Sequence, residues 1–142
     1  MAFKKQKSGG FWRTQGGATE LTLTQTGAGT GTAVIQGNQI IFDVAAVAVG
    51  DYAMRVTTPI SFRIIDVYAI STAATAAVLD IDNDTSSVLG GATLTMAGDT
   101  DVIRATEIDD ANWEFTAGDD DLSVHVATAV FAGMIVIDIL PI

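Results

Sequence analysis

Three carboxylates alternate along one short segment, at Asp80, Asp82 and Asp84. On a strand, alternate side chains point to the same face, and neighbouring carboxylates repel one another unless a cation lies among them. Acids at positions one, three and five also begin the calcium loop of EF-hands, but that loop needs Gly at position six and Glu at position twelve. This chain has Thr85 and Gly91 there. The sequence therefore leaves calcium open as a weak site on the three aspartates and favours a solvated strand end.

A second alternating set, Asp121, Ser123 and His125, would place an acid, a hydroxyl and an imidazole on one face of a strand. These are the side chains of a nucleophile, base and acid set. Side chains two residues apart point in parallel, however, so the hydroxyl and the imidazole rarely meet in line. No G-x-S-x-G turn accompanies the serine, and nothing pairs Glu107 with Glu114 as glycosidase carboxylates. We therefore predict that the chain is not an enzyme.

Glycines at 27, 29 and 31 form a G-x-G-x-G run. The run lacks the third glycine of the dinucleotide-binding fingerprint, and no helix start follows it. A Walker A phosphate loop is excluded because no lysine lies beyond Lys7. The run is predicted to be a glycine-rich turn.

The composition excludes further site classes. The 142 residues include no cysteine and one histidine, which excludes disulfide scaffolds, thiol catalysis and a multi-histidine metal site within one chain. The net charge is −10, yet 49% of the residues are apolar and the mean hydropathy is +0.39. Such a chain folds, as one domain at this length. Its apolar excess predicts either an unusually large core or apolar surface that meets another subunit.

Charge divides the chain into two parts. Residues 1–19 hold four cationic residues and no acid, whereas residues 20–142 hold three arginines and 17 acids. We predict a flexible basic arm over 1–19 and a folded body over 20–142. The arm combines cations with aromatic side chains, a combination that suits docking on a protein surface; the alternative is a disordered end with incidental aromatics. The predicted contact residues are Phe3, Lys4, Lys5, Lys7, Phe11, Trp12 and Arg13.

Two partner classes are not expected. The acidic body opposes the binding of nucleic acid. The lysines precede a polar glycine-rich stretch rather than the apolar run of a secretory signal. The most apolar stretch, 129–140, is too short to span a membrane and contains Asp138. We expect no membrane partner and no specific nucleic-acid partner.

Alternating apolar residues and regularly spaced turn signals indicate an all-β body, an antiparallel β-sandwich or jelly roll with an extended N-terminal arm. The first two strands, within 20–36, are predicted to form a hairpin. The strongest strand, 60–71, is expected to place Phe62, Ile64, Asp66, Tyr68 and Ile70 on one face. The alanines of 71–81 also permit a helix, but we predict a strand there. The expected strands are 20–26, 32–36, 39–49, 51–58, 60–71, 71–81, 92–96, 102–108, 113–115, 122–130 and 133–140.

Three segments carry a resemblance to a known family: FRIIDVYAISTAATAAVLDI, TEIDDANWEFTAGDDDLSVHV and AGMIVIDILP. Together with the glycine-rich basic arm, they resemble small β-sandwich capsid decoration, or cement, proteins of tailed bacteriophages, over roughly residues 39–142. The resemblance implies a structural protein without cofactor that binds the major capsid protein on the exterior of the virion. It also implies a homo-oligomer, often a trimer. No residue roles carry over, because these proteins share architecture rather than invariant residues.

A different class of function is also open. The chain is alternatively a glycan- or receptor-binding sandwich module of a phage tail, baseplate or head fibre. Aromatic rings that stack on sugars would then be needed. The candidates are Trp12, Tyr52, Tyr68 and Trp113, and Trp113 beside an acidic turn is the best placed.

Overall fold

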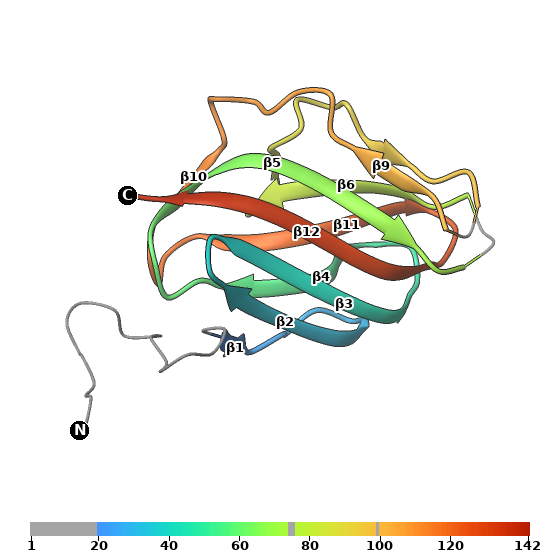
Figure 1. Cartoon of the computed structure of the whole chain (residues 1–142), viewed down its shortest axis with the longest axis horizontal. Helices are drawn as coiled ribbons and strands as arrows, with labels where there is room; N and C mark the ends of the chain where they lie inside the picture. Colours follow the sequence, from blue (N-terminus) through green and yellow to red (C-terminus); the bar gives the residue numbers. More distant parts are fainter. Residues whose placement is uncertain (1–19, 74–75, 99) are drawn as a thin grey trace, which may run out of the picture.

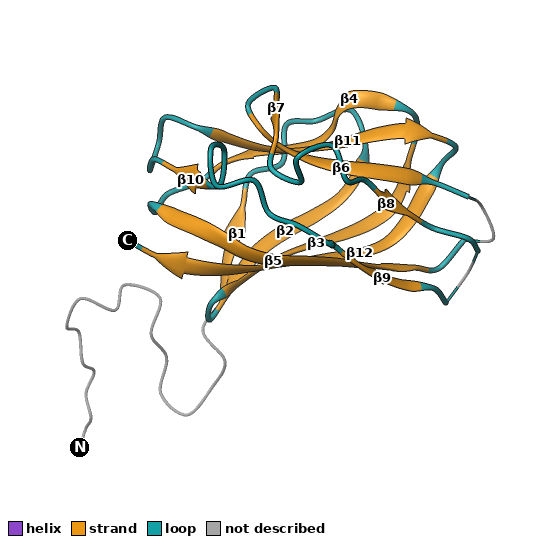
Figure 2. Ribbon diagram, turned by 90° about the horizontal axis from the view of Figure 1, so that it is seen from above, coloured by secondary structure: helices purple, strands orange, loops and turns teal. Residues whose placement is uncertain are grey.

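The computed structural model describes residues 20–142 except 74, 75 and 99. These residues form strands and connecting turns without a helix, and therefore no helix that could cross a membrane. Two antiparallel sheets lie face to face, as the two layers of strands in Figure 2 show. The predicted all-β antiparallel sandwich is confirmed.

The first sheet has seven strands (Figure 1). Its path is β1 (Glu20–Leu23), β2 (Thr30–Gln36), β3 (Gln39–Val47), β12 (Phe131–Pro141), β5 (Phe62–Ser71) and β10 (Glu114–Phe115), and β9 (Val102–Arg104) also pairs with β5. The pairing of β1 with β2 confirms the predicted hairpin.

The second sheet has five strands. Its path is β4 (Gly50–Thr57), β11 (Asp121–Thr128), β6 (Val78–Asn83) and β7 (Ser86–Ser87), and β8 (Leu94–Thr95) also pairs with β6. The crossings of the chain between the sheets include those from β3 to β4 and from β11 to β12. These two crossings lie at one end of the sandwich, because Phe131 pairs with Val47 and Val126 pairs with Gly50.

The inward faces of both sheets form one hydrophobic core. Its largest fully buried side chains include Phe42, Phe62, Phe115 and Phe131. The rings of Phe62 and Phe115 stack with centroids 4.8 Å apart and an interplanar angle of 11°. This stack fixes the short strand β10 on the end of β5, because aromatic pairs add to the free energy of burying their area.

The expected faces of β5 are wrong in the second half of the strand. Phe62 and Ile64 are buried as expected, but the buried residues then become Val67, Ala69 and Ser71. The reason is a bulge: Asp138 pairs with Asp66 and Ile139 with Ile64, which leaves Ile65 as an extra residue, 52% exposed. One extra residue exchanges the two faces of a strand from that point on.

Several expected strands are shorter in the structure; for example, 20–26 is a strand only over Glu20–Leu23, and 92–96 only over Leu94–Thr95. The segment 71–81 is not one strand, since β5 ends at Ser71 and β6 begins at Val78 in the other sheet. Packed sheets lie about 10 Å apart, so the chain between them must leave the strand conformation. The segment 102–108 is a strand only as far as Arg104, and Ala105 then bonds to β5 through a single contact, its N–H to the Val67 carbonyl at 2.8 Å.

Candidate functional site

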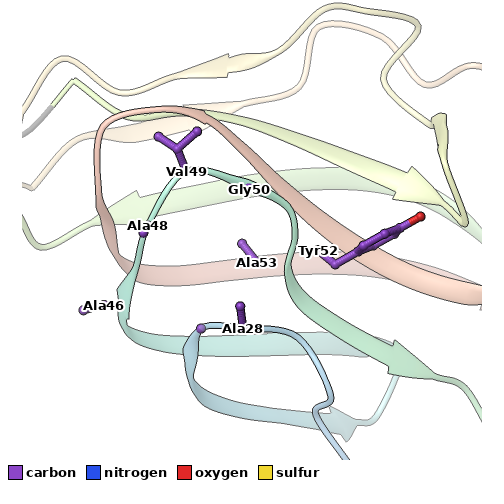
Figure 3. Close-up of a pocket in the computed structure, with 8 residues that line it drawn as sticks. Ala28, Ala46, Ala48, Val49, Gly50, Tyr52 and Ala53 are labelled. Carbon is purple, nitrogen blue, oxygen red and sulfur yellow. The ribbon is translucent and has the colours of Figure 1, made fainter.

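The end of the sandwich where β3 passes into β4 exposes apolar side chains to solvent (Figure 3). The run AAVAVG at 45–50 contains no charged residue. Val47 is buried in the core, but Ala46 and Ala48 are exposed and Val49 is 58% exposed. Val130, in the neighbouring β11–β12 connection, is 45% exposed. We call this region the apolar end.

The loop between β1 and β2 forms one wall of the apolar end. Its backbone runs along the edge of β4, where Ala28 N–H donates to the Tyr52 carbonyl at 3.0 Å and Gly29 N–H to the Ala53 carbonyl at 2.7 Å. Gln25 holds the loop in place, because its Nε2 donates to the Gly29 carbonyl at 2.9 Å. The loop thereby joins an edge of the first sheet to an edge of the second.

Glycine is required in this loop by close packing. A Cβ on Gly29 would lie 2.2 Å from Val47 Cγ2 and 2.7 Å from the Ala53 carbonyl oxygen. A Cβ on Gly31 would lie 2.3 Å from the Asp43 carbonyl oxygen. The G-x-G-x-G run is thus a site of close approach between backbones, which is a stricter requirement than the predicted turn.

The apolar end contains a cavity of about 440 Å³ that is open to solvent. Its described lining residues are Ala28, Gly29, Ala46, Ala48, Val49, Gly50, Tyr52 and Ala53 (Figure 3). None of these carries a charge. The volume falls within the range of about 300–1,000 Å³ that is usual for ligand pockets, so the cavity can take a large apolar side chain of a partner.

A second, polar cavity of about 220 Å³ lies on the outer face of the second sheet. Its described lining residues are Tyr52, Asp82, Thr85 and His125. Tyr52 therefore lines both cavities. Asp82 is only 7% exposed, although it lies on an outward-facing position of β6 opposite Ser123. Sequence analysis missed this cavity because three of its residues come from elements far apart in the chain.

Arg55 fixes Tyr52 between the two cavities. The Arg55 guanidinium lies over the Tyr52 ring, and its Nε donates to Asp121 Oδ2 at 2.8 Å. Thr57 Oγ1 donates to the other oxygen of the same carboxylate. The Asp121 carboxylate thus accepts hydrogen bonds from two β4 side chains, which tie β11 to β4.

The other two arginines of the described residues repeat this arrangement. Arg63 lies over Trp113 and pairs with Glu114 at 2.6 Å. Arg104 lies over Tyr68 and pairs with Asp66 at 3.0 Å. Each described arginine is thus bound to one carboxylate and one aromatic ring, which leaves none of them as an unengaged anion-binding group.

Trp113, the ring best placed for stacking on sugars, is half-buried and packs against the core. The Arg63 guanidinium carbon lies 5.4 Å from its ring centroid. A sugar that stacked on this ring would have to displace the arginine.

The predicted contact residues of the arm, Phe3, Lys4, Lys5, Lys7, Phe11, Trp12 and Arg13, lie outside the described residues.

The three aspartates of the calcium prediction lie within the described residues. Asp80 and Asp82 lie on the outer face of β6, and Asp84 lies in the following turn with φ of 55°. Asp84 Oδ1 accepts the Asp121 N–H at 3.1 Å, and Asp80 Oδ1 accepts Ser87 Oγ–H at 2.9 Å. Among the described residues no three His, Asp or Glu side chains are grouped for a metal, and calcium stays a prediction.

The set Asp121, Ser123 and His125 does share the outer face of β11, as expected. Asp121 is held by Arg55, however, and the Ser123 hydroxyl is fully buried without a hydrogen-bond partner in the described part of the chain. A serine becomes a nucleophile only beside a base that accepts its proton. The described geometry therefore does not join these three side chains into a catalytic set.

The apolar end was visible in the sequence only indirectly. The run over 39–49 indicated a strand, and if that strand continued past the buried Val47, alternation would turn Ala48 outward and Val49 inward. The structure ends the strand at Val47 instead. An apolar run that extends past a strand and up to the turn signal Gly50-Asp51 is the signal that could have located this surface.

Comparison with known proteins assigns the chain to no family. No family model matches the chain, and no curated protein matches it. One solved structure with a similar arrangement is described as "CBM4 structure and function". It is 10% identical in sequence, with a TM-score of 0.37, and the match covers 82% of this chain and 79% of that chain.

Proposed function

We propose that this chain is a non-catalytic structural protein that docks on the assembled capsid of a tailed bacteriophage, as a decoration protein on the exterior of the virion. The single observation that carries the proposal is the apolar end. It is exposed, uncharged in its described lining and large enough to accept a side chain of a partner. The partner is then the major capsid protein.

Burial of the apolar end supplies the binding free energy. Contiguous apolar surface on a soluble protein marks an interaction site. Each square ångström of apolar area removed from water contributes about 25 cal/mol. Ala46, Ala48 and Ala28 are small and lose no side-chain rotamers on binding. A partner can therefore approach the backbone closely at a low entropic cost.

The charge of the body supports a structural role at high density. The body contains 17 acidic residues and only three arginines. Each of these arginines already binds a carboxylate. A strongly negative surface keeps crowded copies soluble and directs basic partner surfaces toward the body. On the shell the copies form a homo-oligomer, a trimer by the resemblance to decoration proteins.

The test uses empty capsids of the source virus that lack this protein. The full chain is incubated with them, and co-sedimentation is measured over a range of concentrations. Wild-type protein should saturate at a fixed ratio to the capsid protein. Ala48→Glu should bind at least about tenfold more weakly, because an unpaired carboxylate would be buried in the interface.

Ala111→Glu is the matched control, because Ala111 is an exposed alanine in the turn after β9 and does not line the apolar end. It should bind as the wild type does. Wild-type protein that fails to co-sediment contradicts the proposal, as does equal loss of binding in both variants. The arm is tested separately by combining Lys4→Glu, Lys5→Glu and Lys7→Glu, which should weaken capsid binding while the body stays folded.

The polar cavity supports a second candidate function, glycan or receptor binding. Tyr52 supplies a ring that is 36% exposed, and Asp82, Thr85 and His125 supply hydrogen-bonding groups beside it. The volume of about 220 Å³ lies below the usual range for ligand pockets, so this candidate ranks second. A glycan array distinguishes the two: a hit that Thr85→Ala abolishes would move glycan binding to first place.

A further inference from the structure

The outer face of the first sheet carries a row of apolar side chains that follows the register across four strands. Val34 of β2 pairs with Ile41 of β3, Ile41 with Val136 of β12, and Val136 with Tyr68 of β5. The solvated face of an antiparallel sheet normally carries polar side chains. Val136 is buried and Val34, Ile41 and Tyr68 are half-buried, so the half-buried members of this row are apolar surface that another segment can cover further.

Val136 shows that the row packs on its own, apart from the core. Val136 is 4% exposed, yet it is not a member of the core cluster, which contains its neighbours Ile135 and Ile137. Side chains alternate between the two faces of a strand. Its burial therefore comes from side chains on the outer face of the sheet, where its register partners Ile41 and Tyr68 are half-buried.

The β1–β2–β3 side of this face is hollowed into a groove of about 390 Å³. Its lining combines three apolar side chains with three uncharged polar ones and two carboxylates: Val34, Ile41 and Met134, then Thr22, Thr32 and Gln36, then Glu20 and Asp43. Neither of these two acids forms an ion pair with a described residue. An apolar floor with an acidic rim fits a segment that combines aromatic side chains with a cation.

We propose that the groove is the seat of residues 11–13 of the same chain. Phe11 and Trp12 supply the aromatic side chains, and Arg13 supplies the cation. The arm from 1 to 19 has four cations and no acid, so its charge is complementary to the rim. Phe11 and Trp12 cover the apolar floor, and Arg13 lies against the carboxylate of Asp43, which pairs with Thr32 at the far end of the groove from Glu20.

The point at which the arm joins the body favours the same chain over a neighbouring copy. The arm ends at Glu20, and Glu20 itself lines the groove. From Glu20 to Arg13 an extended chain reaches roughly 24 Å, whereas the groove from β1 to β12 spans three strand spacings, about 14 Å. Gly16 and Gly17 lie between Arg13 and Glu20 in the sequence. Glycine permits the reversal of chain direction that brings the arm back over the groove. A short tether also gives a high effective concentration.

This inference goes beyond the proposed function and is independent of it. The seated segment uses the groove on the first sheet, whereas capsid docking uses the apolar end. Of the predicted capsid contacts of the arm, the seat takes up Phe11, Trp12 and Arg13, and residues 3–7 remain available for the shell. Failure of capsid binding would leave the seat untouched, and failure of the seat would leave docking through the apolar end untouched.

The absence of native cysteine allows a direct test in the full chain. Thr14→Cys places a thiol beside the segment without removing it, and Thr32→Cys places the second thiol in the groove. Under mild oxidation this pair should form an intrachain disulfide. The control pair joins Thr14→Cys to Thr95→Cys, an exposed position on β8 in the other sheet. The groove pair should close at least about tenfold faster, because seating raises the effective concentration of the two thiols.

Variants of the row complete the test. Val34→Lys places a positive charge on the groove floor, which repels the positive Arg13 of the seated segment. It should reduce the rate of disulfide formation in the groove pair to that of the control pair. Val102→Lys is the matched variant, because Val102 is on the same sheet, is 62% exposed and does not line the groove; it should leave the rate unchanged. Equal rates for both cysteine pairs overturn the proposal. Interchain disulfides as the main product also overturn it, since the occupant would then be the arm of a second copy.

Trp12 gives an independent readout if a cysteine variant fails to fold. In a Trp113→Phe background the remaining tryptophan emission reports on residue 12 alone. A seated ring should emit at shorter wavelength than a solvated one, and Val34→Lys should shift the emission to longer wavelength. Emission typical of solvated tryptophan in the parent protein overturns the proposal.

Discussion

The guanidinium carbon of Arg55 lies 4.5 Å from the centroid of the Tyr52 ring. The same guanidinium is bound to Asp121 on the neighbouring strand. The stack restrains the Tyr52 ring, and Tyr52 lines both the apolar and the polar cavity. A single arginine therefore contacts the one described residue that both candidate surfaces share.

The Arg55–Asp121 pair should contribute measurable stability. The side chains are 34% and 17% exposed, so the pair is less hydrated than an ordinary surface pair. Arg55→Met and Asp121→Asn should each lower the free energy of unfolding by about 1 kcal/mol. The double variant should lose less than the sum, by about 0.5–1 kcal/mol. Urea unfolding monitored by circular dichroism measures all three.

Arg63 and Glu114 form the matched control pair. Their side chains are 40% and 51% exposed, and exposed pairs contribute about 0–1 kcal/mol. The coupling energy of Arg63→Met with Glu114→Gln should therefore be smaller than that of the first pair. Strict additivity of Arg55→Met and Asp121→Asn would show that the contact does not stabilise the fold.

Two buried serines should respond differently to the same substitution. Ser123 is fully buried and its hydroxyl has no partner among the described residues. Ser71 is 1% exposed, and its hydroxyl donates to the Ala73 carbonyl at 2.9 Å. Ser71→Ala should cost about 1 kcal/mol through the lost hydrogen bond, whereas Ser123→Ala should be neutral or stabilising by up to about 1 kcal/mol. Chemical denaturation of both variants checks this, and a larger loss for Ser123→Ala would reveal a hydrogen bond to that hydroxyl.

Gly133 in β12 should tolerate no side chain. Its φ is 146°, and a Cβ there would lie 2.0 Å from the Ile70 carbonyl oxygen. Gly133→Ala should destabilise the protein by about 1–3 kcal/mol or more, because the backbone of two strands must separate. Gly98→Ala is the control, since no atom lies within 4 Å of its Cβ position. Thermal unfolding that ranks the two variants equally would contradict this assignment.

Period-two alternation predicted the sandwich because it reports burial on one face of a strand, a local property. It placed strands within each expected range and identified the hairpin of β1 and β2. It could not show the bulge at Ile65, since a bulge depends on how β12 pairs with β5. For the same reason the expected face of Asp66, Tyr68 and Ile70 was wrong.

The sites were less predictable than the fold. The polar cavity combines Tyr52, Asp82 and His125, which only the order of strands β4, β11 and β6 brings together. The apolar row likewise depends on the β2–β3–β12–β5 register. Sequence analysis did identify the charge division between arm and body, because charge can be counted without knowing which strands are neighbours.

Salt should stabilise the body, and the choice of cation tests the calcium prediction. Residues 20–142 carry 17 acids and three arginines, so screening of their mutual repulsion by sodium chloride should raise the melting temperature. Calcium chloride at the same ionic strength should raise it no further than magnesium chloride does, if Asp80, Asp82 and Asp84 form a solvated strand end. An extra rise in the melting temperature with calcium that Asp84→Asn removes would demonstrate a calcium site. A ligand that binds only the folded state raises the free energy of unfolding, and the increase grows with the logarithm of the ratio of ligand concentration to dissociation constant. A melting temperature that falls with sodium chloride would instead show that the three arginine pairs outweigh the repulsion.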